Sequence, residues 1–368
     1  MTTRFPRSTR LAVLAVCALA PALIAGCGDD DETTTESAAA TDTEDLTAVK
    51  DYLVDHATDL DAQVDLLATN AEEYYALAEE TGFDYDKLMK ENGDEVQALL
   101  EESQEAFVVA NPAYEEMEGI VAGVPRLAHY DVDIDAGASV EDDPEGAVSF
   151  SLEKPDGETL KQPGNLFFLT ETALYGTNPD LLADVTQDVD GDGKVEFGEG
   201  IPDAETYVAT LREFQKQSEE LLADSEAFEP TPSDAFTAIT IMTPTMSEYF
   251  EAWKNSRFIA GDDAEEQGFV ATSRLSDIAD ILTGIQFTYD EIEPMIAAED
   301  EAQAEQTGQQ LADLLAFVED LETREAEGEK FTGEDADTLG SEAQARAEEI
   351  AGQVTQAAEQ LGIELQDA

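Results

Sequence analysis

A regular apolar pattern over residues 46–82 constrains the fold of this chain more than any other sequence feature. Apolar side chains recur there every three or four residues, at Leu46, Val49, Leu53, Ala57, Leu60, Val64, Leu67, Ala71, Tyr74 and Ala78. This spacing places them on one face of a helix, and Gly82 supplies a C-terminal stop signal. We therefore predict one long amphipathic helix that ends at Thr81 and Gly82.

Helical spacing continues beyond this stretch but is interrupted at a proline. We expect a second helix over about 84–110, because Asn111 and Pro112 break the pattern. Pro112 suits the first turn of a third helix, which would run through Gly119. Residues 165–176 are apolar enough to form a short buried helix.

The C-terminal part of the chain is helical by the same criterion. The expected helices cover about 204–226, 233–258, 264–298, 311–321 and 350–361. Ser233 is the expected cap of the second of these helices, and Pro244 should kink it. Pro294 should fray the end of the third helix. These patterns predict an all-α fold built from a pair of helical bundles.

Residues 123–164 differ from the helical regions because they are rich in Gly, Pro and Asp. The segment from Ala147 to Leu152 alternates apolar and polar side chains, as a strand does. Pro155, Asp156 and Gly157 follow it as a turn signal. We therefore expect a small β-hairpin insertion in the first helical half.

A twelve-residue acidic stretch, 188–199, separates the two helical regions. Its acidic residues stand at positions one, three, five, nine and twelve, with glycine at position six, which is the spacing of an EF-hand-type loop. The expected calcium ligands are Asp188, Asp190, Asp192, the backbone carbonyl of Lys194, Glu196 and Glu199. An acidic surface turn is the alternative. Because glycines and a proline follow at once, we expect a structural calcium clip between halves 46–187 and 203–368.

The N-terminus carries the features of an export signal. Three arginines and no acid precede an apolar run over residues 11–24, and small residues then lead to Cys27. The small residues that end at Cys27 resemble a bacterial lipobox, which implies cleavage before Cys27 and a lipid on its sulfur. An ordinary signal peptide is the alternative. No cysteine pair would then remain in the mature chain for a disulfide.

These features divide the chain into three parts. Residues 1–26 are the expected signal peptide, and 27–45 are an acidic tether with too little apolar surface to fold. Residues 46–368 form the expected helical domain. The predicted location is outside the cell, where the lipid anchors the protein to the outer face of a bacterial cytoplasmic membrane.

Net charge restricts the partners of this chain. It holds 86 acidic and 18 basic residues, for a formal net charge of -68. Nucleic acid and anionic lipid headgroups are therefore poor partners. Cations, a basic partner or a solvated surface in a salty setting all suit this charge.

Several acids lie in apolar surroundings and are candidate metal ligands. Glu115 and Glu118 are three residues apart, so they share one helix face, and Glu171 follows two phenylalanines and a leucine closely. A carboxylate beside so much hydrocarbon is unfavourable unless it is paired or binds a cation. Helical proteins hold iron with such carboxylate clusters, and Tyr114 and Tyr175 are candidate helpers.

Alternatives to a metal site remain open. These glutamates can instead pair with Arg126, Arg257 or Arg274. Only two histidines occur; His56 shares a helix face with Asp59, and His129 lies in an acidic loop, so both are weak candidates. The chain has no His-Glu-x-x-His motif, no Gly-x-Ser-x-Gly elbow and no phosphate loop, so we expect no enzyme activity.

At these residues the chain resembles the imelysin-like family, in particular the EfeM/EfeO lipoproteins of bacterial iron uptake. The resemblance rests on three stretches: Tyr114-Glu115-x-x-Glu118 before Ile134-Asp135-Ala136, the segment 167–176 around Glu171, and the segment 273–282 around Asp277. It implies an all-helical pair of bundles that binds metal outside the membrane, with Asp135 joining Glu115, Glu118 and Glu171. The family motif His-x-x-Glu matches at Glu171, but Phe168 replaces its histidine, which implies an all-oxygen site or a changed ligand.

Three functions follow, in order of preference. The first is a lipid-anchored protein that captures iron and delivers it to a membrane permease. The second is an envelope scaffold or interaction lipoprotein that has lost the metal. The third is a peptidase-like hydrolase, for which the sequence offers no nucleophile or zinc motif.

Overall fold

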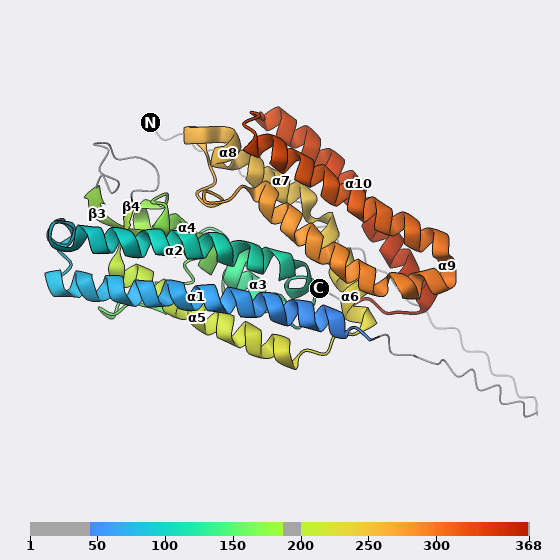
Figure 1. Ribbon diagram of the computed structural model, residues 1–368, viewed down its shortest axis with the longest axis horizontal. Coiled ribbons are helices and arrows are strands. Elements are labelled where there is room, and N and C mark those ends of the chain that lie inside the picture. The colour runs from blue at the N-terminus through green and yellow to red at the C-terminus, as the bar shows by residue number, and fades with distance from the viewer. Residues whose placement is uncertain (1–44, 187–199, 367–368) are drawn as a thin grey trace, which may run out of the picture. The chain divides into compact units, whose positions relative to one another are not determined.

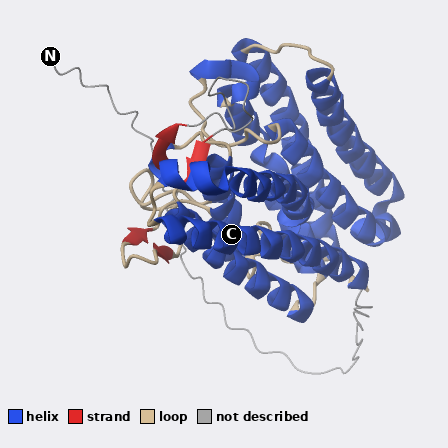
Figure 2. Cartoon of the chain, turned by 60° about the vertical axis from the view of Figure 1, so that its left-hand side comes forward, coloured by secondary structure: helices blue, strands red, loops and turns tan. Residues whose placement is uncertain are grey.

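In the computed structural model, residues 45–186 and 200–366 are described, and they lie within one compact unit, Thr43–Ala368. Helices dominate this unit, and two small pairs of strands accompany them (Figure 2). The expected signal peptide, the expected lipidation site Cys27 and nearly all of the expected tether fall outside the described residues, and so does the expected calcium loop 188–199. Among the described helices, none has the length and apolar character needed to cross a membrane.

The first bundle is made of four helices: α1 (Thr47–Thr81), α2 (Tyr85–Val121), α4 (Leu166–Leu174) and α5 (Ala204–Ala227). The helix α1 packs along both α2 and α5, and α4 contacts α2 and α5 (Figure 1). The apolar face predicted for residues 46–82 is the buried face of α1, where Leu53, Leu60 and Val64 are fully buried. The helix ends at Gly82, whose φ of 70° is the left-handed conformation that favours glycine.

The second bundle also has four main helices: α6 (Pro232–Met242), α7 (Met246–Asn255), α9 (Arg274–Ala326) and α10 (Gly333–Leu361). The helix α10 packs against α6, α7 and α9 (Figure 1). Trp253 of α7 is fully buried, and its indole N–H donates to Glu325 at 2.8 Å.

The helix α9 is two antiparallel helices joined at Asp300. Asp300 has φ -146° and ψ 92°, which are extended values. The Tyr289 hydroxyl donates to the Ala304 carbonyl at 2.8 Å, although the two residues are 15 positions apart. A straight helix would separate them by about 22 Å, so the chain must reverse between them. The predicted end of a helix near residue 298 therefore agrees with the break at Asp300. Pro294 lies inside the first of the two helices.

Short elements connect the helices within each bundle. They are α3 (Ala128–Asp131), the π-helical η1 (Val132–Ala136), η2 (Pro179–Leu181), η3 (Thr243–Thr245), α8 (Arg257–Ala260), η4 (Gly261–Asp263), β1 (Ser151–Glu153), β2 (Thr159–Lys161), β3 (Leu182–Thr186) and β4 (Gly200–Pro202). The strands β1 and β2 pair antiparallel around the turn at 155–157, where Gly157 has φ 90°. Strand β1 begins at Ser151, later than the alternation from Ala147 predicted.

The two bundles meet where α2 lies against α9. The backbones approach closely at Gly284, where an added Cβ would lie 1.9 Å from the Glu116 carbonyl oxygen. Any side chain at Gly284 would push the helices apart. This contact brings the C-terminal part of α2 beside the first turns of α9, and the functional residues lie at that junction.

The expected helix break at Pro112 is wrong. The helix α2 runs through Pro112 to Val121, and its irregular residue is Asn92, with φ -131° and ψ 17°. Proline removes one backbone hydrogen bond from a helix. Here Ala110, Ala113 and Tyr114 on both sides of it are buried, and their packing holds the helix together.

Two expected helix starts in the second bundle are also wrong. Thr231, not Ser233, caps α6, because Pro232 occupies the first helical position that proline prefers. The helix expected from about residue 264 begins only at Arg274. Phe269 has φ 52°, a left-handed value that no helix accepts, so residues 264–273 form a loop.

The expected division of the chain also differs from the structure. The strands β3 and β4 pair antiparallel, so the chain returns after residue 199 to the side from which it left. The helix α5 therefore packs on α1 in the first bundle. The change of bundle lies between α5 and α6 instead of at the stretch 188–199.

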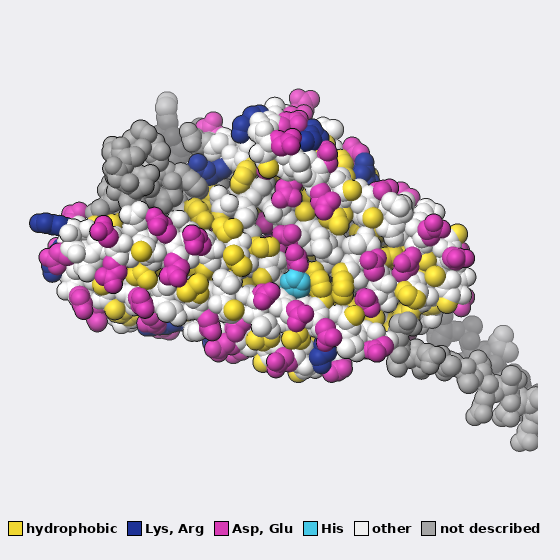
Figure 3. Space-filling model, viewed as in Figure 1, with side chains coloured by type: hydrophobic (Ala, Val, Ile, Leu, Met, Phe, Trp, Pro, Cys, Tyr) yellow, Lys and Arg dark blue, Asp and Glu magenta, His cyan; other side chains and the backbone are white. Residues whose placement is uncertain are grey.

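The charged side chains on one face of this unit are mostly acidic (Figure 3). Figure 3 shows one face on which Asp and Glu far outnumber Lys and Arg, with apolar side chains between them. This distribution agrees with the net charge of -68.

Candidate metal centre

Three carboxylates meet at the junction of the bundles. Glu115 and Glu118 lie one turn apart on α2, and Asp135 lies on η1. One oxygen of each lies within 4.8 Å of one oxygen of the other two. Glu115 is 1% exposed and Glu118 is 3% exposed, so water screens their charges poorly. These three of the four acids expected at an iron site are thus together.

Hydrogen bonds hold one oxygen of each glutamate. The Asn111 amide donates to Glu115 Oε1 at 3.1 Å, and the Tyr249 hydroxyl donates to Glu118 Oε1 at 2.9 Å. Thr272 in turn donates to the Asn111 oxygen at 2.7 Å. The other oxygens, Glu115 Oε2 and Glu118 Oε2, are buried and accept no hydrogen bond from the described residues. Buried acceptors are rarely left unpaired, so these two oxygens suit a bound cation.

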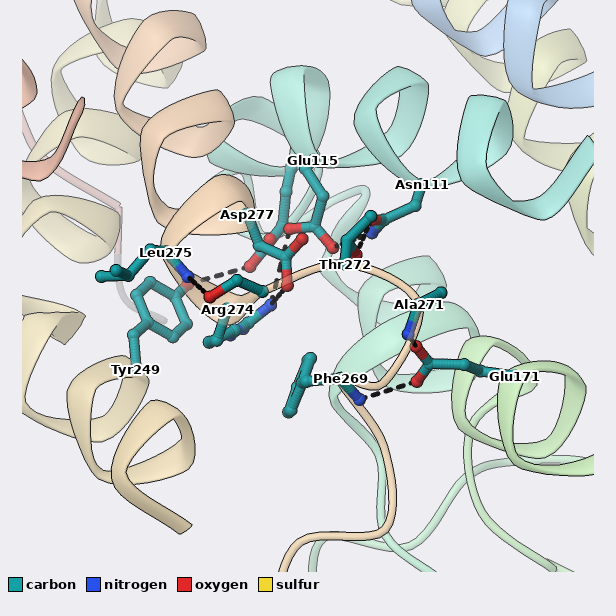
Figure 4. Close-up of polar contacts among 12 residues, drawn as sticks. Asn111, Glu115, Glu171, Tyr249, Phe269, Ala271, Thr272, Arg274, Leu275 and Asp277 are labelled. Carbon is teal, nitrogen blue, oxygen red and sulfur yellow. Dashed lines mark hydrogen bonds and ion pairs between the residues drawn. The ribbon is translucent and has the colours of Figure 1, made fainter. Parts of the chain in front are cut away.

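Arg274 is the cation closest to this cluster (Figure 4). Its Nη1 lies 3.1 Å from Asp277 Oδ2 and 3.7 Å from Glu115 Oε2, and the side chain is almost fully buried. The alternative that the glutamates pair with an arginine is therefore confirmed in part, because Glu115 pairs with Arg274. Asp131 adds a further buried acid, which accepts from the Tyr114 hydroxyl at 2.9 Å.

Five acids therefore share one buried region with one arginine: Glu115, Glu118, Asp131, Asp135 and Asp277. Their negative charges are not balanced by the described side chains. Tyr114 was expected as a metal helper, and its hydroxyl is committed to Asp131.

Burial and mutual repulsion raise the pKa values of these acids. Burial, then repulsion from Asp277, raises the pKa of Glu115 well above its usual range. Burial, then repulsion from Asp135, raises the pKa of Glu118 to about 7. Burial also raises the pKa of Asp277 to about 6, although Arg274 opposes this shift. The cluster therefore holds protons near neutral pH, and a cation can replace them.

Glu171 does not join the cluster, which corrects the expected set of ligands. Its carboxylate accepts hydrogen bonds from the backbone N–H groups of Phe269, Val270 and Ala271, at 2.7, 2.8 and 2.8 Å (Figure 4). Burial raises the pKa of Glu171 to about 7, and these three donors oppose the shift. Glu171 thus holds the loop 264–273. No local sequence pattern indicated this contact.

A cavity of about 490 Å³ lies beside the cluster. Its lining includes Glu115, Glu118 and Asp135, together with Phe168 and Glu171. Among the described residues that line it, no histidine or cysteine occurs, so the available metal ligands are oxygens, apart from the Met242 sulfur. Such oxygens suit hard cations.

The remaining candidates lie elsewhere. His56 Nε2 is 3.1 Å from Glu116 Oε2, so its partner is Glu116 and not Asp59. The His129 ring lies against the Tyr130 ring, with centroids 4.1 Å apart. Neither histidine lines the cavity.

Sequence reasoning missed Asp131, Tyr249 and Asn111 as site residues. Asp131 sits in a run of alternating acids, and Asn111 was taken only as a helix breaker. The signal available for Asn111 was its position four residues before Glu115, which places both on one helix face. No local signal points to Tyr249, which reaches the site only through packing of α7.

Fold and site together define a helical protein in which two bundles enclose a cavity lined by carboxylates. The family profile for imelysin (Peptidase_M75) matches residues 94–360, and the chain belongs to this family. The match includes the whole cluster, from Asn111 to Asp277. A comparison with curated proteins finds no match for this chain.

Proposed function

We propose that this protein is an exported, lipid-anchored and non-catalytic binding protein for iron, which it delivers to a membrane permease in the manner of the EfeM/EfeO type. One observation carries the metal-binding part: Glu115 Oε2 and Glu118 Oε2 are buried near Asp135 and accept no hydrogen bond from any residue that the structure describes. Membership of the imelysin family is compatible with a role in iron uptake.

The donor set favours a hard cation of high charge. Glu115, Glu118 and Asp135 offer three carboxylates, and each would lose its repulsion when a cation binds between them. Soft metals prefer sulfur ligands, and the described residues around the cavity provide none apart from Met242. Ferric iron fits these oxygens, and the family resemblance favours iron over other hard cations.

The N-terminal features support the location in this proposal. The arginine-rich start, the apolar run and Cys27 favour export and a lipid anchor. A lipid on Cys27 would keep the bound metal close to a permease in the same membrane. Residues 27–45 would then act as the tether.

The test is metal binding by the mature chain without its lipid. Iron should bind in a one-to-one ratio, measured by calorimetry and by elemental analysis of the purified protein. Glu118→Gln removes one ligand and should weaken binding at least about tenfold, by analogy with changes around other metal sites. Glu105→Gln, on the exposed side of the same helix, is the matched control.

Two results would count against this function. If neither ferrous nor ferric iron binds, the alternative of an interaction lipoprotein without metal gains support. If Glu118→Gln and Glu105→Gln bind iron equally well, the metal sits elsewhere.

A further inference from the structure

Arg274 is an unusual residue to find in a cation site, since it is itself a cation. Its guanidinium lies between two aromatic rings, 4.5 Å from the centroid of Tyr249 and 4.6 Å from that of Phe269. Such stacking fixes the plane of the guanidinium. Arg274 therefore stays at the cavity wall as a fixed group with a defined orientation.

One hydrogen-bond donor of Arg274, its buried Nε, is unused among the described residues. A guanidinium has five N–H donors. The contacts of Arg274 with Asp277 and Glu115 both use Nη1. A fixed, buried guanidinium with a free donor is the group that recognises a carboxylate or carbonate by paired hydrogen bonds.

The cavity is also larger than a metal ion requires. Six waters at roughly 30 Å³ each, a full first hydration shell, would fill roughly 180 Å³. The cavity measures about 490 Å³, within the range of small-molecule sites. Hard cations take six or more oxygens, so Glu115, Glu118 and Asp135 leave coordination positions for another ligand.

Charge requires the cation to bind before the anion. Acidic side chains line this cavity, including Glu115, Glu118 and Asp135, and any charge that they carry repels a free anion. A cation held by Glu115 and Glu118 would remove that repulsion. Arg274 Nη1 is 3.7 Å from Glu115 Oε2, so an anion that binds the cation also comes within reach of the guanidinium.

Building on the proposed function, we propose that this cavity binds the cation together with a small chelating anion, a carboxylate or carbonate, whose outer oxygens accept hydrogen bonds from Arg274. The anion bridges the cation and the guanidinium. The protein thus selects a metal complex and not the bare ion.

The experiment measures what the mature chain retains after gel filtration. Ferric iron is supplied with radiolabelled citrate in one arm and with radiolabelled bicarbonate in another, so that the two anions are distinguished. A third arm supplies ferrous iron without oxygen and without either anion, and a fourth supplies each anion without iron. We expect one anion per iron in at least one of the first two arms, and none in the fourth.

Variants of Arg274 test its role. Arg274→Lys keeps the charge but loses the planar fork, and should retain iron with at least tenfold less anion. Arg274→Gln should lose the anion more completely; its fold is checked by circular dichroism. If Arg274→Gln fails to fold, the ratio of anion to iron in the wild type and in Arg274→Lys still tests the proposal.

The outcomes separate this inference from the proposed function. Iron retained without any anion in every arm overturns the inference and leaves the proposed function standing. Anion retained equally by wild type and Arg274→Lys, or retained without iron, also overturns it. If no iron is retained in any arm, the proposed function itself fails.

Discussion

The carboxylate of Glu171 accepts hydrogen bonds from three consecutive backbone amides. It is not a member of the carboxylate cluster. The loop that it holds carries Thr272, which orients Asn111, and leads into Arg274. Asn111 in turn binds Glu115. Glu171 thus acts on the site through the loop, as a positioning residue.

Glu171→Gln should therefore destabilise the protein without removing a metal ligand. The neutral amide has one acceptor atom, and its NH₂ group would face backbone donors, so we expect a loss of about 2 kcal/mol, typical of a charge-assisted hydrogen bond. Urea unfolding measures this loss, and Glu105→Gln is the control. Unchanged stability with complete loss of iron binding would instead make Glu171 a ligand.

At the scale of elements, the reversal within α9 depends on Asp300. Its extended backbone separates the two helices, and its side chain accepts from the backbone N–H groups of Ala302 and Gln303, both at 3.1 Å. This is the arrangement of a helix N-cap. The antiparallel packing of the two helices lets Tyr289 reach Ala304.

Asp300→Ala should lower the free energy of unfolding by about 1 kcal/mol, the usual effect of removing an N-cap. Chemical denaturation with urea gives the value. Glu301→Ala, next to it and exposed, should have a smaller effect. Equal losses for both variants would mean that Asp300 does not cap the second helix.

The β3 and β4 pair flanks the stretch where calcium is predicted. Gly176 and Gly200 touch there, since an added Cβ on Gly200 would lie 2.4 Å from the Gly176 Cα. The flanking chain is thus closely packed and should respond to an ion bound at 188–199.

Removal of calcium with a chelator should lower the melting temperature, because the five carboxylates of the loop would repel one another without the ion. Asp190→Ala should reproduce this loss and make the protein insensitive to the chelator. Calorimetric melting curves, with and without added calcium, test both. A melting temperature that changes in neither case would exclude a bound ion.

At the scale of the whole molecule, buried acids link stability to pH. Burial raises the pKa of Glu171 to about 7, and burial with repulsion from Glu116 raises the pKa of Asp280 to about 7. Both values lie above those of the unfolded chain, near 4. The stability that these groups contribute is therefore fully present below about pH 4 and is lost as pH rises through 7.

The metal-free protein should accordingly melt a few degrees lower at pH 8 than at pH 5.5. Repulsion among surface acids acts in the same direction, and added salt screens that part alone. Melting curves in low and high salt, with a chelator present, separate the two effects. A melting temperature that rises over this range in high salt would contradict the assignment of raised pKa values.

Local pattern was a good guide to the helices and a poor guide to their ends. The period over residues 46–82 predicted α1 because burial of one face every 3.6 residues is a local property. Pro112 was misjudged, because packing on both sides of a proline outweighs one lost hydrogen bond. The loop before Arg274 was misjudged for the same kind of reason: Glu171, about a hundred residues earlier, binds its backbone.

The sequence by itself determined the helical class, the acidic surface and the shared helix face of Glu115 and Glu118, since these follow from composition and from spacing along one chain segment. Only the tertiary structure decided that Asp135 joins them, that Glu171 does not, and that Arg274 stands at the cavity wall. Those positions depend on how α2, α4 and α9 pack, and contacts between distant segments leave no periodic trace in the sequence.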